Sequence, residues 1–169
     1  MNRFASDHSR NASLTGGVVV LTLSDTRTQE NDAGGDLAIE LATAAGHRLI
    51  DRLILKEEPQ LIAETVGRYA DNAEVDAIFI TGGTGIARRD RTCETIAQLL
   101  TQEIPGYGEL FRYLSFKEIG PASMLSRAQA GLIDDTFVLT MPGSPGAVRL
   151  AMEQLILPEL SHLLEERRR

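Results

Sequence analysis

The feature that most constrains the fold is a run of β-branched and apolar residues at Gly17–Leu23, with the sequence GVVVLTL. A strand with one face in water alternates apolar and polar residues, and this run shows little of that alternation. Such runs are typical of strands buried on both faces, as in parallel sheets that helices cover. The sequence therefore predicts an α/β protein with an interior strand near its N-terminus.

Strands and helices alternate along the first hundred residues. Each predicted helix carries an apolar stripe; Gly46 ends the first helix and Pro59 begins the second. This alternation predicts βαβ units with right-handed crossovers, so the sheet is mostly parallel and covered on both faces. The predicted segments are a helix over Asp32–Ala45, a strand over Arg48–Leu55, a helix from Pro59, a strand over Ala77–Ile80 and a helix over Thr92–Leu100.

The second half of the chain is less regular. We expect a turn at Ile104–Gly108 and short helices over Glu109–Phe116 and Pro121–Arg127. Two apolar runs, Ala130–Ile133 and Thr136–Met141, are separated by two aspartates, which predicts a hairpin and one antiparallel edge strand. In the C-terminal part, the order Ser-Pro at 144–145 predicts a capped helix, and a proline at 158 kinks or restarts it.

Length and composition narrow the class of protein. The chain has 169 residues, which fits one domain over 16–169 preceded by a polar, mobile arm over 1–15; docking of this arm on a neighbouring subunit is the alternative. One cysteine and three histidines exclude an intrachain disulfide and a cysteine-rich zinc site. A net charge of −7 argues against a general nucleic-acid binder, although a local basic patch remains open. The chain shows no membrane span and no secretory signal, so we expect a cytoplasmic protein.

Three polar segments follow predicted strands. Parallel α/β sheets bind ligands outside the carboxyl ends of their strands. This rule selects Ser24–Thr28, Thr81–Arg91 and Pro142–Gly146, which are rich in glycine, serine, threonine and charged residues. We expect a binding site where these segments meet.

The segment Thr81–Arg91 reads TGGTGIARRDR. Its glycines let backbone N–H groups approach an anion, and it leads into a helix whose N-terminus favours negative charge. The local charge of this segment is positive, although the chain is acidic, because it contains Arg88, Arg89 and Arg91. The segment matches neither a Walker A loop nor a dinucleotide fingerprint. It predicts a phosphate or other oxyanion site; the alternative is a glycine turn with solvated arginines.

Carboxylates near the predicted strand ends are the candidate catalytic groups. Asp90 stands among the arginines, where it would hold Mg²⁺ or accept a proton beside bound phosphates, or form only a structural ion pair. Asp25 and Glu57 follow the first two strands and could act with it, while Asp25 is also a common turn residue.

Together these motifs resemble the molybdenum cofactor biosynthesis family of molybdopterin-binding domains, closest to its MoaB branch beside the Mog relatives. The resemblance covers about Gly17 to Leu164. The residues that carry it are Leu23-Ser24-Asp25, Ile80–Gly85, Ala87–Asp90, Pro105–Glu109 with Arg112, Leu125–Ala128 with Gly131, and Met141–Ser144.

The resemblance implies a three-layer α/β/α sandwich with a mixed sheet, assembled as a homotrimer or a hexamer of two trimers. It also implies a site for molybdopterin, a pterin with a dithiolene and a terminal phosphate. In the Mog branch, Mg-ATP adenylylates that phosphate and pyrophosphate leaves. ATP, Mg²⁺, molybdopterin and other proteins of the pathway are therefore the implied cosubstrate, cofactor, ligand and partners.

One departure from the Mog pattern concerns catalysis. Mog-type enzymes carry an aspartate after a proline at the end of the second strand, where this chain has Lys56-Glu57. Glu57 retains a carboxylate there, on a side chain that is one methylene longer. This pattern resembles MoaB, whose members are not all active adenylyltransferases, so a non-catalytic binder or carrier is the alternative function. Asp90, as the Mg²⁺ ligand, and Glu57 are the expected catalytic residues. The expected ligand-binding residues are Ser24, Asp25, Thr81, Gly82, Gly83, Thr84, Gly85, Arg88, Arg89, Ser126, Arg127, Pro142, Gly143 and Ser144.

Overall fold

A computed structural model describes residues 14–88 and 90–167 of the chain. The arm expected over 1–15 falls outside this description apart from its last two residues, and Arg89 also lies outside it. The described elements are β1 (Gly17–Leu23), α1 (Ala33–Ala44), β2 (Arg48–Leu55), α2 (Pro59–Ala70), β3 (Ala77–Thr81), α3 (Thr92–Leu99), β4 (Gln102–Glu103), α4 (Pro105–Ile119), the 3₁₀ helix η2 (Gly120–Leu125), β5 (Ala130–Ile133), β6 (Thr136–Met141), α5 (Pro145–Ala151), the π-helical turn η3 (Met152–Ile156) and α6 (Leu157–Arg167).

The sheet has six strands in the order β2-β1-β3-β6-β5-β4. β1 pairs parallel with β2 and β3, and β3 pairs parallel with β6. β5 runs antiparallel to β6, as the predicted hairpin requires, and the two-residue β4 continues the sheet beyond it. The mostly parallel mixed sheet with an antiparallel edge is therefore confirmed, although the sequence did not predict β4.

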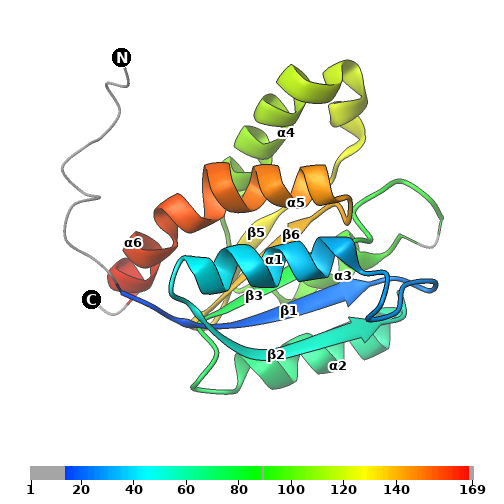
Figure 1. Ribbon diagram of the computed structural model, residues 1–169. Helices are drawn as coiled ribbons and strands as arrows, with labels where there is room; N and C mark the ends of the chain where they lie inside the picture. The colour runs from blue at the N-terminus through cyan, green and yellow to red at the C-terminus, as the bar shows by residue number, and fades with distance from the viewer. Residues whose placement is uncertain (1–13, 89, 168–169) are drawn as a thin grey trace, which may run out of the picture.

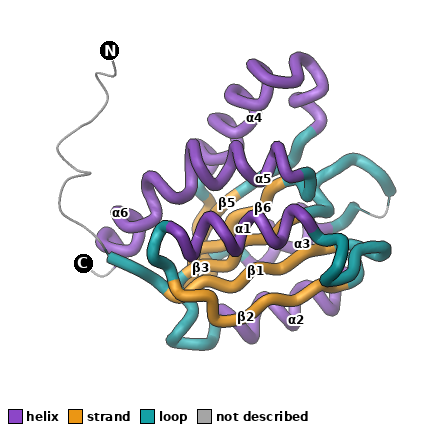
Figure 2. Tube along the Cα trace, viewed as in Figure 1, coloured by secondary structure: helices purple, strands orange, loops and turns teal. Residues whose placement is uncertain are grey.

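Helices cover both faces of this sheet, as Figures 1 and 2 show. Val18 and Val20 of β1 pack in one core with residues of α1, α5 and α6. Val19 and Leu21 face the opposite way, into a second core with residues of α2 and α3. Because β1 is buried on both faces, its continuous apolar character is explained, and the three-layer α/β/α architecture is confirmed.

The helix α4 corrects one prediction. The residues Pro105–Gly108 form its first turn and not a separate turn, so Glu109–Phe116 belongs to a single 15-residue helix. In place of the helix expected over Pro121–Arg127, the 3₁₀ helix η2 follows at Gly120–Leu125. Together α4 and η2 project from the rest of the molecule (Figure 1). Below, the arm means this α4–η2 segment and not the N-terminal arm expected over 1–15.

The C-terminal helical segment behaves as its prolines predict. Ser144 caps α5 by accepting a hydrogen bond from the Ala147 amide at 3.4 Å. Because Pro158 has no amide hydrogen, it cannot complete the preceding helical turn. The turn before it widens into η3, and α6 restarts at Leu157. Within the described residues, no helix is both long and apolar enough to cross a membrane.

Candidate functional site

The loops that follow β1, β3 and β6 lie at one end of the molecule, toward which these strands point (Figure 1). The register places Thr22 beside Thr81, and Thr81 beside Met141, so the three strands end at the same level. The segments selected from the sequence therefore begin side by side at the carboxyl edge of the sheet.

The backbone after β3 follows a path that only glycine adopts readily. Gly82 and Gly83 have φ angles of 93° and 65°, in the left-handed region. A Cβ atom on Gly82 would lie 2.3 Å from the carbonyl oxygen of Leu23, and one on Gly83 would lie 2.0 Å from Oγ1 of Thr92. The glycine loop (Gly82–Gly85) is thus pressed between the end of β1 and the start of α3.

A pocket of about 340 Å³ brings the glycine loop together with Ser126 and the Pro142–Ser144 segment. Its opposite wall comes from the arm, with Phe111 and Ser115 of α4 among its residues. The sequence predicted the loop side of this pocket. It did not predict the arm side, because the turn expected at Ile104–Gly108 separated those residues from a continuous helix.

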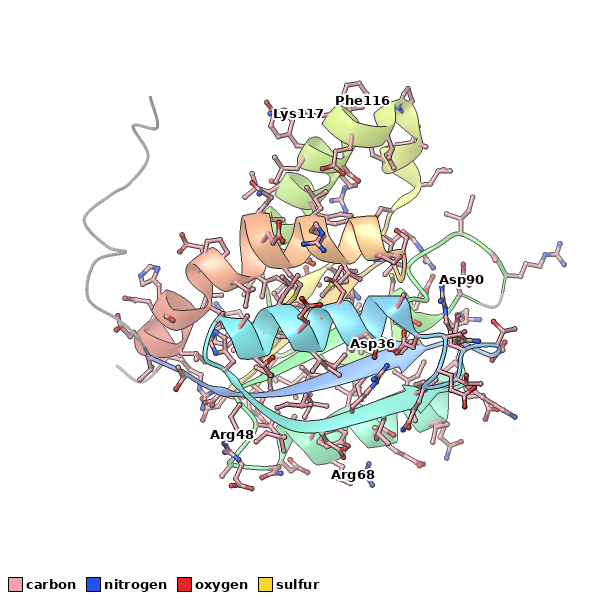
Figure 3. All side chains as sticks on the ribbon, viewed as in Figure 1. Asp36, Arg48, Arg68, Asp90, Phe116 and Lys117 are labelled. Carbon is pink, nitrogen blue, oxygen red and sulfur yellow. The ribbon has the colours of Figure 1, made fainter. Side chains whose placement is uncertain are left out.

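A second pocket, of about 360 Å³, lies where the glycine loop continues toward α3. Three cationic side chains, those of Arg88, Arg91 and Arg127, line it together with the carboxylates of Asp90 and Glu94. The Asp90 carboxylate accepts a hydrogen bond from the amide of Ala87 at 3.0 Å, so it closes a tight turn within the loop. Figure 3 shows Asp90 at the same end of the molecule as Asp36 at the start of α1.

Arg127 holds the loop that links these two pockets. Its Nε donates to the carbonyl of Gly85 at 2.8 Å, and its Nη2 donates to that of Asp90 at 2.6 Å. Its amide donates to the carbonyl of Thr84 at 3.1 Å, and its Nη1 pairs with Glu94. A guanidinium fixed in this way supports the loop as a framework, whether or not it also reaches a bound anion.

Glu57 approaches the glycine loop from β2. Its Oε2 is buried and lies 3.4 Å from the position of a Cβ on Gly83, while its amide donates to Asp25 at 3.4 Å. Asp25 itself is exposed. The structure therefore brings both predicted carboxylates to the edge where the glycine loop begins.

Two further predicted residues, Ser24 and Thr81, and the buried Cys93 near the glycine loop have local structural contacts. Ser24 accepts hydrogen bonds from the amides of Thr26 and Arg27 at 3.2 and 3.1 Å and so orders its own loop. The side chain of Thr81 is fully buried. Cys93 is buried, its Sγ donates to the carbonyl of Arg127 at 3.2 Å, and burial raises the pKa of its thiol to about 11. The Cys93 thiol is therefore a packing group at neutral pH.

Magnesium needs oxygen ligands, and it commonly takes one or two from protein carboxylates and the rest from water and substrate phosphates. Across residues 14–88 and 90–167, no group of three or more His, Cys, Asp or Glu side chains is arranged to hold a metal ion. Asp90 and Glu57 nevertheless supply carboxylates on two sides of the glycine loop. These residues fit an ion that arrives with a phosphate ligand better than one held by protein alone.

Comparison with known proteins identifies the family and the fold. Residues 19–162 match the family model described as "Probable molybdopterin binding domain". The chain is 47% identical over 160 residues to molybdenum cofactor biosynthesis protein B of Halalkalibacterium halodurans, with 94% of each chain covered. A crystal structure of a molybdenum cofactor biosynthesis protein B superposes with a TM-score of 0.90 at 45% identity, covering 94% of this chain and 99% of that one. The tungsten cofactor synthesizing protein MoaB from Pyrococcus furiosus superposes with a TM-score of 0.81 at 32% identity, covering 92% and 98%.

The fold and the candidate site define an α/β protein with two neighbouring pockets beside the carboxyl edge of a mostly parallel sheet, one lined by the glycine loop and the other by three arginines. The chain belongs to the molybdopterin-binding domain family of molybdenum cofactor biosynthesis proteins.

Proposed function

We propose that this protein binds molybdopterin in the pocket between the glycine loop, the Pro142–Ser144 segment and the arm. The observation that carries the proposal is the composition of this pocket, which has glycines and hydroxyl-bearing residues on one wall and the exposed apolar side chains of Ile119 and Leu125 on the other. Amides on glycine and at a helix start suit a phosphate, and an apolar wall suits a planar pterin. The protein would do this in the cytoplasm.

We further propose that the protein adenylylates molybdopterin with Mg-ATP. An oxygen of the molybdopterin phosphate attacks the α-phosphorus of ATP, a new P–O–P bond forms, and pyrophosphate leaves. Phosphoryl chemistry of this kind needs positioning and charge stabilisation more than a covalent protein group. The cation-lined pocket around Arg88 and Arg91 would hold the polyphosphate, together with Arg89, which lies outside the described residues.

Asp90 and Glu57 are the residues that would hold Mg²⁺ in this reaction. Bound there, the ion would neutralise charge on the phosphates. The chain's own part would be to keep the two carboxylates in place: the Ala87 amide donates to that of Asp90, and that of Glu57 lies beside Gly83.

We also propose that the arm lies in the contact between subunits of a homotrimer or hexamer. Its exposed face carries large apolar side chains, which single soluble chains rarely gather in one patch. Figure 3 shows Phe116 near the tip of the arm. These side chains are Leu110, Tyr113, Phe116 and Met124, each more than 50% exposed. Light scattering that finds only an 18.4 kDa particle at micromolar concentration would contradict this assembly.

The test of function is turnover with molybdopterin and Mg-ATP, measured as pyrophosphate release, beside a direct binding titration. An adenylyltransferase gives both binding and turnover. Binding with no turnover would support the carrier function, which the replacement of the Mog-type aspartate by Glu57 favours. No binding at all would contradict both functions.

A further inference from the structure

A chain of buried polar side chains runs beneath the glycine loop from helix α1. Asp32, the N-cap of α1, accepts hydrogen bonds from Oγ1 of Thr22 at 2.6 Å, from the amide of Gly35 at 3.0 Å and from Nη2 of Arg52 at 3.0 Å. Oγ1 of Thr81 donates in turn to Oγ1 of Thr22 at 3.2 Å. Asp32, Thr22 and Thr81 are 1%, 3% and 0% exposed, so water does not compete for these bonds.

The direction of these hydrogen bonds is fixed by chemistry. The Asp32 carboxylate can only accept, so the single hydroxyl proton of Thr22 points to it. The Thr81 hydroxyl must then be the donor to Thr22. A charged acceptor strengthens such a chain, which leaves the Thr81 side chain with one orientation.

The position of this chain ties it to the ligand pocket. Thr81 is the last residue of β3, and the next residue, Gly82, starts the glycine loop. The first turn of α1 also touches the other ligand loop, because a Cβ on Gly34 would lie 2.6 Å from the carbonyl oxygen of Gly143. Gly143 in turn lies against Gly82, whose Cα is 3.5 Å from the position of a Cβ on Gly143.

We propose that Thr81 is a positioning residue for ligand binding, because its hydroxyl, held through Thr22 by Asp32, fixes the root of the glycine loop. Thr81, expected from the sequence as a ligand-binding residue, therefore contributes its hydroxyl to this chain and not to the ligand. The affinity measurement rests on the proposed function, in which molybdopterin is the ligand. Its structural part, the fixed position of Gly82, holds without any ligand.

A buried ion pair is a weak means of stabilising a fold, since apolar residues of similar size often serve as well or better. Arg52 and Asp32 form a partly buried pair, at 20% and 2% side-chain exposure. Its place directly under two ligand loops is what a positioning role requires. A purely structural role predicts that any buried hydroxyl of the sheet matters equally for ligand affinity.

The chain offers a matched control for that distinction. Thr136 is 2% exposed, and its single hydroxyl proton is shared between the carbonyls of Val75 at 3.2 Å and Ala70 at 3.3 Å, at the opposite end of the sheet. Thr81→Val and Thr136→Val each delete one buried hydroxyl without changing size. Thr81→Ser restores the hydroxyl at the first site.

The experiment measures molybdopterin affinity and amide hydrogen exchange in the intact protein and these three variants. The Gly82 amide, which donates to the carbonyl of Met141 at 2.9 Å, reports on the root of the loop. We expect Thr81→Val to weaken molybdopterin binding about tenfold and Thr81→Ser or Thr136→Val to change it less than about twofold, given the usual net contribution of one hydrogen bond. In the ligand-free protein, Gly82 should exchange faster in Thr81→Val than in Thr136→Val.

Equal affinities and equal Gly82 exchange in the two valine variants would overturn the proposal. If the unmodified protein does not bind molybdopterin, the proposed function fails, and the exchange of Gly82 alone then decides whether Thr81 positions the loop. Faster exchange only in Thr81→Val would still support the positioning role.

Discussion

Replacing Gly83 by alanine should damage both stability and ligand binding, because two separate constraints act on this residue. Its φ of 65° lies in the left-handed region, which costs an L-residue about 1–2 kcal/mol. The added Cβ would also lie 2.0 Å from Oγ1 and 2.8 Å from Cβ of Thr92, which is fully buried at the start of α3. Relief requires movement of the loop or of α3, so we expect a total loss of about 2–4 kcal/mol in unfolding free energy.

Chemical denaturation and molybdopterin titration measure the two effects. Gly146→Ala is the control, because a Cβ there meets nothing within 4 Å and its φ is not positive, so alanine should be neutral or slightly stabilising. The double variant Gly83→Ala with Thr92→Ala removes the closest contact and should lose less stability than the two single changes added together. Full stability and wild-type affinity in Gly83→Ala would refute this reasoning.

Three further predictions concern titratable and charged groups. Asp90→Asn should lower the turnover of adenylyl transfer about 10²–10³-fold, which is the usual effect of losing one electrostatic group. Molybdopterin affinity should change little. Equal turnover in wild type and variant would exclude Asp90 from the reaction. His47 is buried and accepts a hydrogen bond from the Gly16 amide at 3.2 Å, and burial lowers its pKa from the usual 6.5 despite the opposing charge of Asp76. Its contribution to stability is therefore present above about pH 6.5 and is lost as the pH falls toward the lowered pKa. Between pH 7.5 and pH 5, the free energy of unfolding should drop more in wild type than in His47→Gln, as measured by chemical denaturation. Cys93, with its thiol pKa raised to about 11, should react with iodoacetamide at pH 8 far more slowly in the folded than in the unfolded protein, and equal rates would contradict its burial.

The fold was predictable where one strong local pattern decides it. The strand at Arg48–Leu55 and the helix start at Pro59 appear with the predicted bounds, because strand patterning and an N1 proline act within a few residues. The loop side of the pocket was predictable for a related reason. The carboxyl ends of parallel strands always meet at one edge of a sheet.

The arm side of the pocket was not predictable from local patterns. Gly106 and Gly108 look like turn residues, yet both lie inside the first turn of α4. The structure gives the reason for Gly108, since a Cβ there would lie 2.5 Å from the carbonyl oxygen of Ala128. This glycine permits close contact between two distant segments, and such contacts leave no signal in the spacing of nearby residues.

The same limit applies to Arg127 and Asp32. The family resemblance presents Arg127 as a ligand-binding residue, whereas its hydrogen bonds to the carbonyls of Gly85 and Asp90 make it a support of the loop. Asp32 shows in the sequence only as a residue at a helix start, because its partners Thr22 and Thr81 come from two separate strands. Long-range hydrogen bonds of this kind become visible only in the folded structure.

The most direct test of ligand binding by this protein is a crystal structure of its complex with molybdopterin. We predict the ligand's phosphate on the amides of the glycine loop and its pterin between that loop and the arm, near Ile119 and Leu125. Binding of molybdopterin elsewhere, with the pocket formed by Gly82–Gly85, Ser126 and Pro142–Ser144 left empty, would contradict the proposed site.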